Sequence, residues 1–177
     1  MKHLLSFIAP VVWLMATPVA GANAPSVSDP AQACNQFDDP VQQIKGCTDY
    51  IRRSKTPGVN VAVAYMNRGI ARAARGDTKR ALADFAESIR LAPDNPFSYY
   101  NRANLYYDRK DYKRAISDYS VAIERDEDFM LAYFNRGLAY EKLGDQPRMI
   151  ADFKRALELD PEAVAVRERL NKLRVKD

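Results

Sequence analysis

The fold is indicated by a short motif that occurs three times, as YMNRG at 65–69, YYNRA at 99–103 and YFNRG at 133–137. Each copy starts 34 residues after the previous one, and no gap is needed to align them. Other columns keep the same spacing: Asp77, Asp111 and Asp145; Ala81, Ala115 and Met149; Phe85, Tyr119 and Phe153; Ser88, Ala122 and Ala156; Pro93, Glu127 and Pro161. Chance would not hold so many columns in register, so the chain contains three copies of one unit.

Each unit is predicted to be a pair of antiparallel helices. The first half carries apolar residues at helical spacing, and a turn then follows at Gly76-Asp77, Lys110-Asp111 and Gly144-Asp145. Glycine ends the first helix and aspartate caps the second. Lys110 stands in the glycine column, so we expect that turn to be strained or less left-handed. The small Gly69 and Gly137 fit where two helices cross closely.

The unit resembles the tetratricopeptide repeat, whose pattern has an aromatic residue, then Leu-Gly, Tyr, Ala, Phe and Pro. The second copy matches it at Tyr99, Ala103, Tyr106, Ala115, Tyr119 and Ala122, and the third at Tyr133, Gly137, Tyr140, Phe153, Ala156 and Pro161. The departures are Arg72 for Tyr, Met149 for Ala, Glu127 for Pro, and Arg68, Arg102 and Arg136 for Leu. The resemblance implies an all-α, right-handed α-solenoid of three helix hairpins, at 62–95, 96–129 and 130–163.

Further helices are expected to close both ends of the array, because a stacked array needs polar caps. A tail and a capping helix occupy 23–61; the tail, 23–32, is expected to be loose. The capping helix, Pro40–Arg53, has Val41, Ile44, Cys47 and Ile51 on one side. At the other end, 164–177 is expected to be a C-terminal solvating helix, within a helical stretch Glu162–Val175. Its expected inner residues are Ala163, Val166, Leu170 and Leu173, and Arg169 is among those expected to face water.

An arginine of each first helix is followed 16 residues later by an aspartate of the second helix. The recurrence of opposite charges on the two helices of a hairpin predicts the ion pairs Arg68–Asp84, Arg102–Asp118 and Arg136–Asp152. The alternative is two independently solvated columns, because exposed pairs contribute only about 0–1 kcal/mol.

The first residues, 1–22, are predicted to be a signal peptide. A positive start at Lys2 precedes the apolar run Leu4–Ala16, and Ala20-x-Ala22 fits a signal peptidase, so cleavage is expected after Ala22. The run is shorter than the roughly 20 residues of a membrane span, which disfavours that alternative. The product is expected to be periplasmic or secreted, without stable membrane insertion.

The two cysteines, Cys34 and Cys47, both follow this leader, and an even count in an exported chain favours a disulfide. Along one continuous helix they would lie roughly 20 Å apart, too far for a bond. A turn is therefore expected at Asp38-Asp39-Pro40, with Asp39 capping a helix that begins at Pro40. The alternative is two buried, unbonded thiols.

Composition and motif content exclude several function classes. The chain is 47% apolar and 28% charged, as in an ordinary folded protein. The only histidine, His3, lies in the leader, so a mature chain lacks the imidazole of Ser-His-Asp or Cys-His catalysis and of most zinc sites. No phosphate loop or nucleophile motif occurs. No catalytic residue, metal or cofactor is expected, and the carboxylates Asp108, Asp111 and Glu141 have no evident pocket.

The resemblance implies a noncatalytic module whose first helices line a concave groove for a peptide or protein segment. The expected groove residues are Met66, Asn67, Ile70, Tyr100, Asn101, Asn104, Tyr107, Phe134, Asn135 and Leu138. The asparagines could instead hold neighbouring turns. Arg52–Arg90 has nine basic and three acidic residues, which we interpret as a solvated surface rather than a nucleic-acid site. The alternative functions are a structural, self-assembling protein and, less favoured, an enzyme.

Overall fold

The computed structural model describes residues 30–35 and 38–174, and every regular element in these ranges is a helix. In chain order they are α1 (Pro30–Cys34), α2 (Pro40–Arg53), α3 (Val59–Ala74), α4 (Thr78–Leu91), α5 (Pro96–Asp108), α6 (Tyr112–Arg125), α7 (Met130–Leu143), α8 (Gln146–Leu159) and α9 (Val164–Arg174). The expected all-α class is therefore confirmed. None of these helices combines the length and apolarity that a membrane span requires. The expected signal peptide, 1–22, lies outside the described residues.

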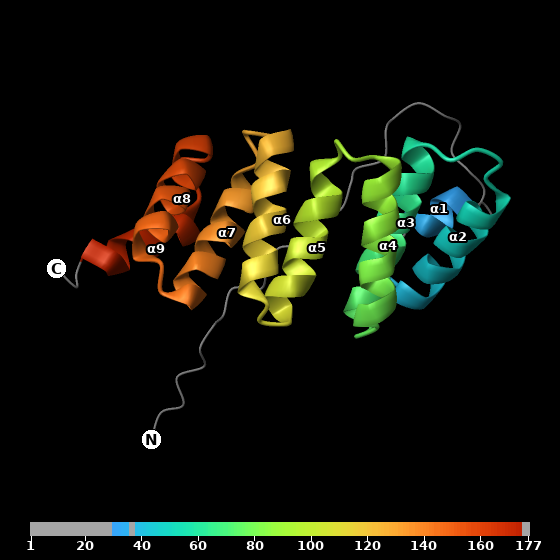
Figure 1. Ribbon diagram of the computed structural model, residues 1–177, viewed down its shortest axis with the longest axis horizontal. Coiled ribbons are helices and arrows are strands. Elements are labelled where there is room, and N and C mark those ends of the chain that lie inside the picture. The colour runs from blue at the N-terminus through green and yellow to red at the C-terminus, as the bar shows by residue number, and fades with distance from the viewer. Residues whose placement is uncertain (1–29, 36–37, 175–177) are drawn as a thin grey trace, which may run out of the picture.

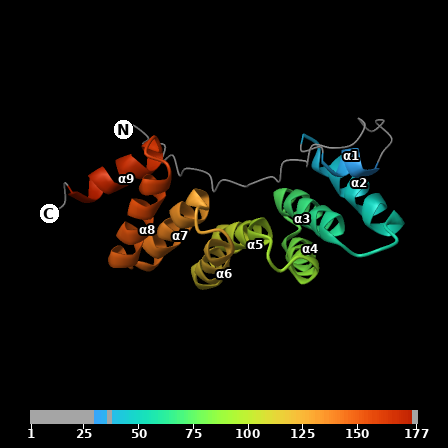
Figure 2. The ribbon, with the colours of Figure 1, turned by 90° about the horizontal axis from the view of Figure 1, so that it is seen from above.

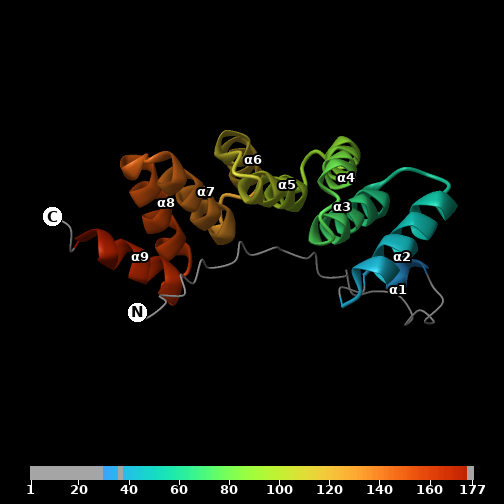
Figure 3. The same ribbon diagram turned by 90° about the horizontal axis from the view of Figure 1, so that it is seen from below.

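Three hairpins, α3–α4, α5–α6 and α7–α8, stack in sequence order, which confirms the expected solenoid (Figure 1). The row bends into an arc whose inner side carries α3, α5 and α7 (Figures 2 and 3). The 34-residue period is visible in the helix bounds, because α5, α7 and α9 begin at Pro96, Met130 and Val164. α9 is thus the first helix of a fourth unit, and its second helix is absent from the described residues.

The turns within the hairpins follow the expected chemistry. The carboxylates of Asp77, Asp111 and Asp145 each accept a hydrogen bond from the backbone N–H three residues later, at 3.1–3.3 Å. The residue before each aspartate is left-handed: Gly76 has φ 78°, Gly144 has φ 75° and Lys110 has φ 61°. The expected strain at Lys110 is confirmed, because a residue with a Cβ adopts the same conformation as the two glycines.

Replacing Lys110 with glycine is expected to raise the free energy of unfolding by about 1 kcal/mol, because the turn would lose its Cβ clash. Urea unfolding followed by circular dichroism measures this gain. The control is Arg109→Gly in the same turn, where φ is −82° and no gain is expected. A Lys110→Gly protein no more stable than the unaltered chain would show that the turn is unstrained.

The aromatic column packs onto the small-residue column, as the sequence predicts. A Cβ placed on Gly69 would lie 2.8 Å from Cε1 of Phe85, and one on Gly137 would lie 2.6 Å from Cε1 of Phe153. Both distances are shorter than any real contact, so a side chain at either glycine would force the two helices apart. Both phenylalanines are fully buried. The hairpin core therefore depends on these close crossings.

All three predicted ion pairs are present and half-buried. In each, the arginine Nε and Nη2 donate to the two oxygens of one aspartate, at 2.8 and 3.0 Å in the Arg68–Asp84 pair. The other two pairs, Arg102–Asp118 and Arg136–Asp152, have the same fork, at 2.7–2.9 Å. The alternative of two separate solvated columns is therefore wrong.

The arginines also join neighbouring units. Nη1 of Arg68 donates to Oγ1 of Thr48 on α2 at 3.1 Å, and Nη1 of Arg136 donates to Oγ of Ser120 on α6 at 2.9 Å. The corresponding position of the first repeat is Ala86, which has no hydroxyl. The charged column that replaces leucine in this chain therefore links both helices of a hairpin and, at two junctions, the hairpins themselves.

Both ends differ from expectation in detail. Residues 30–32 belong to α1 rather than to a loose tail. Val41 is 52% exposed, whereas Cys47 is buried and Ile44 and Ile51 are partly buried as expected; α2 also buries Gln43 and Gly46. The reason is that α1 packs against the side of α2 that carries Gly46, where an added Cβ would lie 2.5 Å from Cβ of Ala33.

The inner residues expected for the last helix are partly confirmed. Val166 is buried, and Leu170 packs on the same cluster, as does Ala163, which precedes the start of α9 at Val164. The side chain of Leu173 lies outside the described residues. Arg169 does not face water as expected: it is half-buried and pairs with Glu141 of α7.

Candidate functional site

We call the side of the array formed by α3, α5 and α7 the inner face (Figure 2), and these three helices carry the ten residues predicted for the groove. The structure buries nine of them and leaves Tyr107 half-buried. Met66 and Ile70 pack with Phe85. Tyr100 joins a second cluster, and Phe134 and Leu138 join a third. These nine side chains fill the space between helices rather than stand open to solvent, because stacked hairpins approach closely.

The centre of the inner face is a buried hydrogen-bond network. Nδ2 of Asn135 donates to the hydroxyl of Tyr100 and to Oδ1 of Asn104, both at 3.0 Å. The hydroxyl of Tyr119 donates to the same Oδ1 at 2.6 Å. The network joins α5, α6 and α7, and burial raises the pKa of both tyrosines, so they stay neutral at physiological pH.

The asparagine column repeats this linkage at the first unit. Nδ2 of Asn67 donates to Oδ1 of Asn35 at 3.0 Å, which ties α3 to the residue that follows α1. In the middle unit, Nδ2 of Asn101 donates to the carbonyl oxygen of Phe97 within α5 at 2.9 Å. Asn67 and Asn135 therefore hold neighbouring units together, which is the alternative that the sequence left open for this column.

Two carbonyl oxygens of the column have a separate property. Oδ1 of Asn67 and Oδ1 of Asn135 are buried and accept no hydrogen bond from the described residues. A buried acceptor without a donor costs about 1–3 kcal/mol.

The residues at the border of the inner face are half-buried, and their side chains are aliphatic or aromatic. Phe97 and Leu131 precede the network on α5 and α7, and Tyr107 follows it on α5. Burial, and then the neighbouring Tyr112 and Glu141, raise the pKa of Tyr107 to about 12. Aromatic side chains of this kind offer contact area at a low entropy loss.

Arg169 is a polar residue of this face that the sequence analysis missed. It lies 34 residues after Asn135, so it continues the asparagine column into α9. The 34-residue spacing could have placed Arg169 in this column, because α9 keeps the register of the repeat. Val166 is buried in α9, as Ala132 is buried one unit earlier in α7. The column therefore ends in a guanidinium paired with Glu141.

Two of the three carboxylates considered for catalysis, Asp111 and Glu141, have structural partners. Asp111 caps α6 and pairs with Arg114, which holds the pKa of its carboxyl group below the ordinary value. Glu141 pairs with Arg169. In the part of the chain that the structure describes, no three residues of the types Cys, His, Asp and Glu are grouped as a metal site would require.

The family comparisons agree on the repeat. A model described as a TPR repeat matches residues 103–144, and two described as tetratricopeptide repeat match 85–117 and 131–162. No curated protein matches the chain.

Solved structures show the same fold. MamA 41-end from Desulfovibrio magneticus RS-1 is 25% identical, with a TM-score of 0.70 over 82% of this chain and 80% of that chain. The Arabidopsis OM64 TPR domain is 27% identical, with a TM-score of 0.62 over 66% and 96% of the two chains. The first TPR of Spaghetti (RPAP3), solved bound to the HSP90 peptide SRMEEVD, has a TM-score of 0.64 over 70% and 98%. At 24% identity, that last likeness is one of fold alone.

Proposed function

Since the chain is a tetratricopeptide-repeat protein, we propose that it is an interaction module that binds an extended peptide or protein segment along its inner face. The fold is typical of protein–protein interaction, and proteins that have it are generally noncatalytic. The observation that carries the proposal is the border of the inner face, where Phe97, Leu131 and Tyr107 are half-buried on the neighbouring helices α5 and α7.

The binding mode follows from the chemistry of these groups. Apolar side chains of an extended segment would contact the half-buried Phe97, Leu131 and Tyr107 at the border, where aromatic rings offer a large apolar contact area. Another protein with this fold, the first TPR of Spaghetti, was solved bound to an HSP90 peptide.

The proposal places the module in the periplasm or outside the cell, after cleavage that follows Ala22. The leader-like sequence of 1–22 supports this location. The Cys34–Cys47 disulfide supports it further, because disulfides persist in oxidising compartments.

A displayed library of random peptides, selected on the purified protein, tests the binding. For a selected peptide, we expect Tyr107→Ala to weaken binding at least tenfold in fluorescence anisotropy, because half-buried aromatic contact area is lost. This side chain has no hydrogen bond among the described residues. Asn171→Ala, at an exposed asparagine of α9, is the matched control and should have no effect.

Thermal melts separate lost binding from lost folding, because Tyr107 also packs against two buried clusters. Full affinity in the folded Tyr107→Ala variant would contradict the proposed inner-face site. A selection that yields no binding peptide would contradict the peptide-binding function itself.

A further inference from the structure

The connections between the helices lie along two opposite edges of the array. Consecutive helices from α2 to α8 run in opposite directions, so the turns within the hairpins lie at the lower edge in Figure 1 and the loops between units at the upper edge. We call the lower edge, which includes the start of α2, the turn edge, and the upper one the loop edge. Both edges follow the same arc, because they are the two ends of the same helices.

The turn edge is basic along the three repeats. The aspartate of each turn pairs with an arginine three residues later, as Asp77–Arg80, Asp111–Arg114 and Asp145–Arg148. The other cations of these turns are exposed and have no ion pair among the described residues: Arg75, Lys79, Arg109, Lys110, Lys113 and Lys142. The exposed anion without such a partner there is Asp108. The turn edge of the repeats therefore carries an excess of positive charge.

The loop edge of the same repeats is acidic. Its carboxylates are Asp94, Glu124, Asp126, Glu127, Asp128, Glu158, Asp160 and Glu162. Three arginines, Arg125, Arg155 and Arg167, lie within 4.0 Å of carboxylates of this edge. Arg90 is paired with Glu87 inside α4. Four carboxylates keep no ion pair in the part of the chain that the structure describes: Glu124, Asp126, Glu127 and Asp160.

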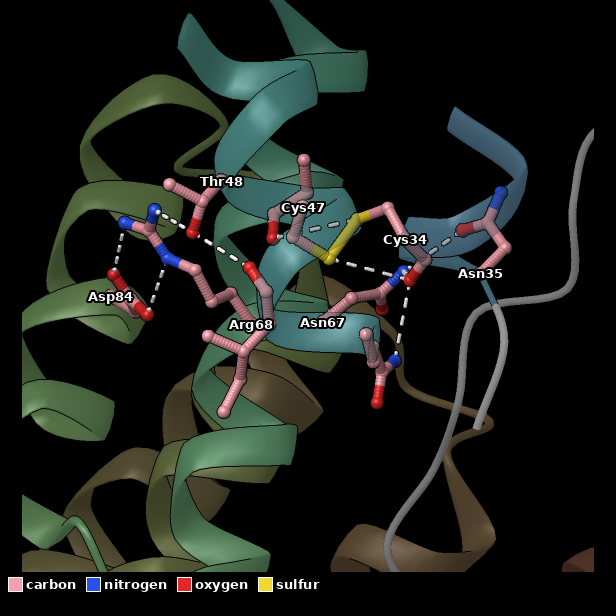
Figure 4. The surroundings of a disulfide bond; sticks show 10 residues. Cys34, Asn35, Cys47, Thr48, Asn67, Arg68 and Asp84 are labelled. Carbon is pink, nitrogen blue, oxygen red and sulfur yellow. Dashed lines mark hydrogen bonds and ion pairs between the residues drawn. A yellow bond between two sulfur atoms is a disulfide. The ribbon is translucent and has the colours of Figure 1, made fainter. Parts of the chain in front are cut away.

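The α1–α2 pair reverses the sign of both edges. Asp38 and Asp39 lie on its turn edge, and Arg53 and Lys55 lie on its loop edge, all of them exposed. α2 is a fixed part of the array, because a disulfide joins it to α1 and Arg68 of α3 donates to its Thr48 (Figure 4). Every unit thus has opposite charges at its two ends, and the sign changes at the same unit on both edges.

This pattern matches a second copy of the chain. If one copy is displaced along the helix direction without rotation, its turn edge meets the loop edge of the other copy unit by unit, and opposite charges face each other throughout. A two-fold axis would instead bring turn edge to turn edge, where the repeats repel. An anionic lipid surface would attract the turns of the three repeats but repel Asp38 and Asp39.

We propose that the protein associates with itself edge to edge, with the turn edge of one copy on the loop edge of the next and the units in register. The contact is heterologous, so each bound pair leaves one free edge of each kind and the association extends into rows. The inner face lies along the sides of the helices rather than at their ends. Self-association is therefore separate from the proposed peptide binding, and each can fail without the other.

Sedimentation velocity of the purified protein at two salt concentrations tests the association. Exposed charges act over roughly 30 Å at an ionic strength of about 0.01 M and over roughly 3 Å at about 1 M. The weight-average mass is expected to rise with protein concentration at the lower ionic strength and to remain that of the monomer at the higher one. A monomer under both conditions, or association that persists at high salt, would overturn the proposal.

Reversing the charge of one edge tests which surface is used. Arg109→Glu with Lys113→Glu makes the central turn acidic, so association at low salt should be lost. The matched control is Lys45→Glu with Lys154→Glu, which changes the net charge equally at exposed positions within α2 and α8, away from both edges. The control should associate as the unaltered chain does. Equal behaviour of the two folded variants, checked by circular dichroism, would overturn the assignment of the turn edge.

A complementary variant tests the register. Glu124→Lys with Glu127→Lys makes the central loop basic, and this protein alone should also remain monomeric at low salt. Mixed with the Arg109→Glu, Lys113→Glu protein, it should associate again in alternating copies, because acidic turns then meet basic loops. A mixture that stays monomeric would contradict the proposed pairing of the edges.

Vesicles of phosphatidylglycerol test the competing partner. Co-sedimentation with them is expected to be the same for the Arg109→Glu, Lys113→Glu protein and for its control of equal net charge. Vesicle binding that only the turn-edge variant loses, in a chain that does not self-associate, would assign the turn edge to a membrane surface and overturn the proposal.

Discussion

Replacing Phe153 with alanine is expected to lower the free energy of unfolding by about 4 kcal/mol. Phe153 is fully buried, lies against the backbone of Gly137, and has its ring centroid 5.7 Å from that of Phe134. It belongs to the cluster that joins α7 and α8 to Val166 of α9. The cavity cannot close easily, because the helices already meet at Gly137. Urea unfolding with circular dichroism measures the loss.

The neighbouring unit supplies a control for this prediction. Tyr119 occupies the same column, and its hydroxyl reaches Asn104. The residue corresponding to Asn104 in the third repeat is Leu138, which cannot accept that bond. Phe153→Tyr should therefore cost about 1–3 kcal/mol for a buried hydroxyl without a partner. An alanine variant that loses less stability than the tyrosine variant would show that the ring contributes little packing.

Replacing Asp84 with asparagine is expected to cost about 3 kcal/mol. Asp84 accepts from Arg68 through both carboxylate oxygens and from Arg72 at 2.7 Å, and its side chain is 4% exposed. Asparagine keeps the shape but removes the charge, so two half-buried guanidinium groups lose their counter-ion. Because the site is sheltered from solvent, the loss should persist at high salt, unlike that of a surface pair.

Two other aspartates provide comparisons for this prediction. Among the described residues Asp118 pairs with Arg102 alone, so Asp118→Asn should cost less unfolding free energy than Asp84→Asn. Asp111→Asn is the surface control, because asparagine also caps a helix and the Asp111–Arg114 pair is exposed on the arginine side. Equal losses of unfolding free energy for Asp84→Asn and Asp118→Asn, measured in urea, would show that Arg72 contributes nothing.

Arg72 illustrates what repeat patterns can and cannot reveal. The sequence marks it as a departure from the tyrosine that the other two repeats have at this position. Only the structure shows that it turns to Asp84, giving that carboxylate two arginines. The ion pairs were predicted by comparing equivalent positions of the three repeats. Arg72 has no equivalent arginine in the other repeats, so this comparison could not reveal its contact with Asp84.

The candidate site was likewise predicted only in part from the sequence. The sequence placed the ten groove residues on the correct helices, because helical spacing assigns residues to a face. It did not predict that nine of them would be buried, since burial depends on how closely consecutive hairpins stack. It also assigned Arg169 to solvent, although the 34-residue register carried it into the asparagine column.

The sequence by itself predicted the helices from Pro40 onward, their caps and the number of hairpins, and it named the disulfide and the three ion pairs, each against an open alternative. These features depend on local conformation or on spacings that repeat, and both can be read along the chain. Only the tertiary structure decided that residues 30–34 form a helix packed on α2 at Gly46, that Val41 is exposed, and that Oδ1 of Asn67 and Oδ1 of Asn135 lack a donor among the described residues. Those outcomes depend on distances between surfaces that meet after folding, and a spacing along the chain does not specify them.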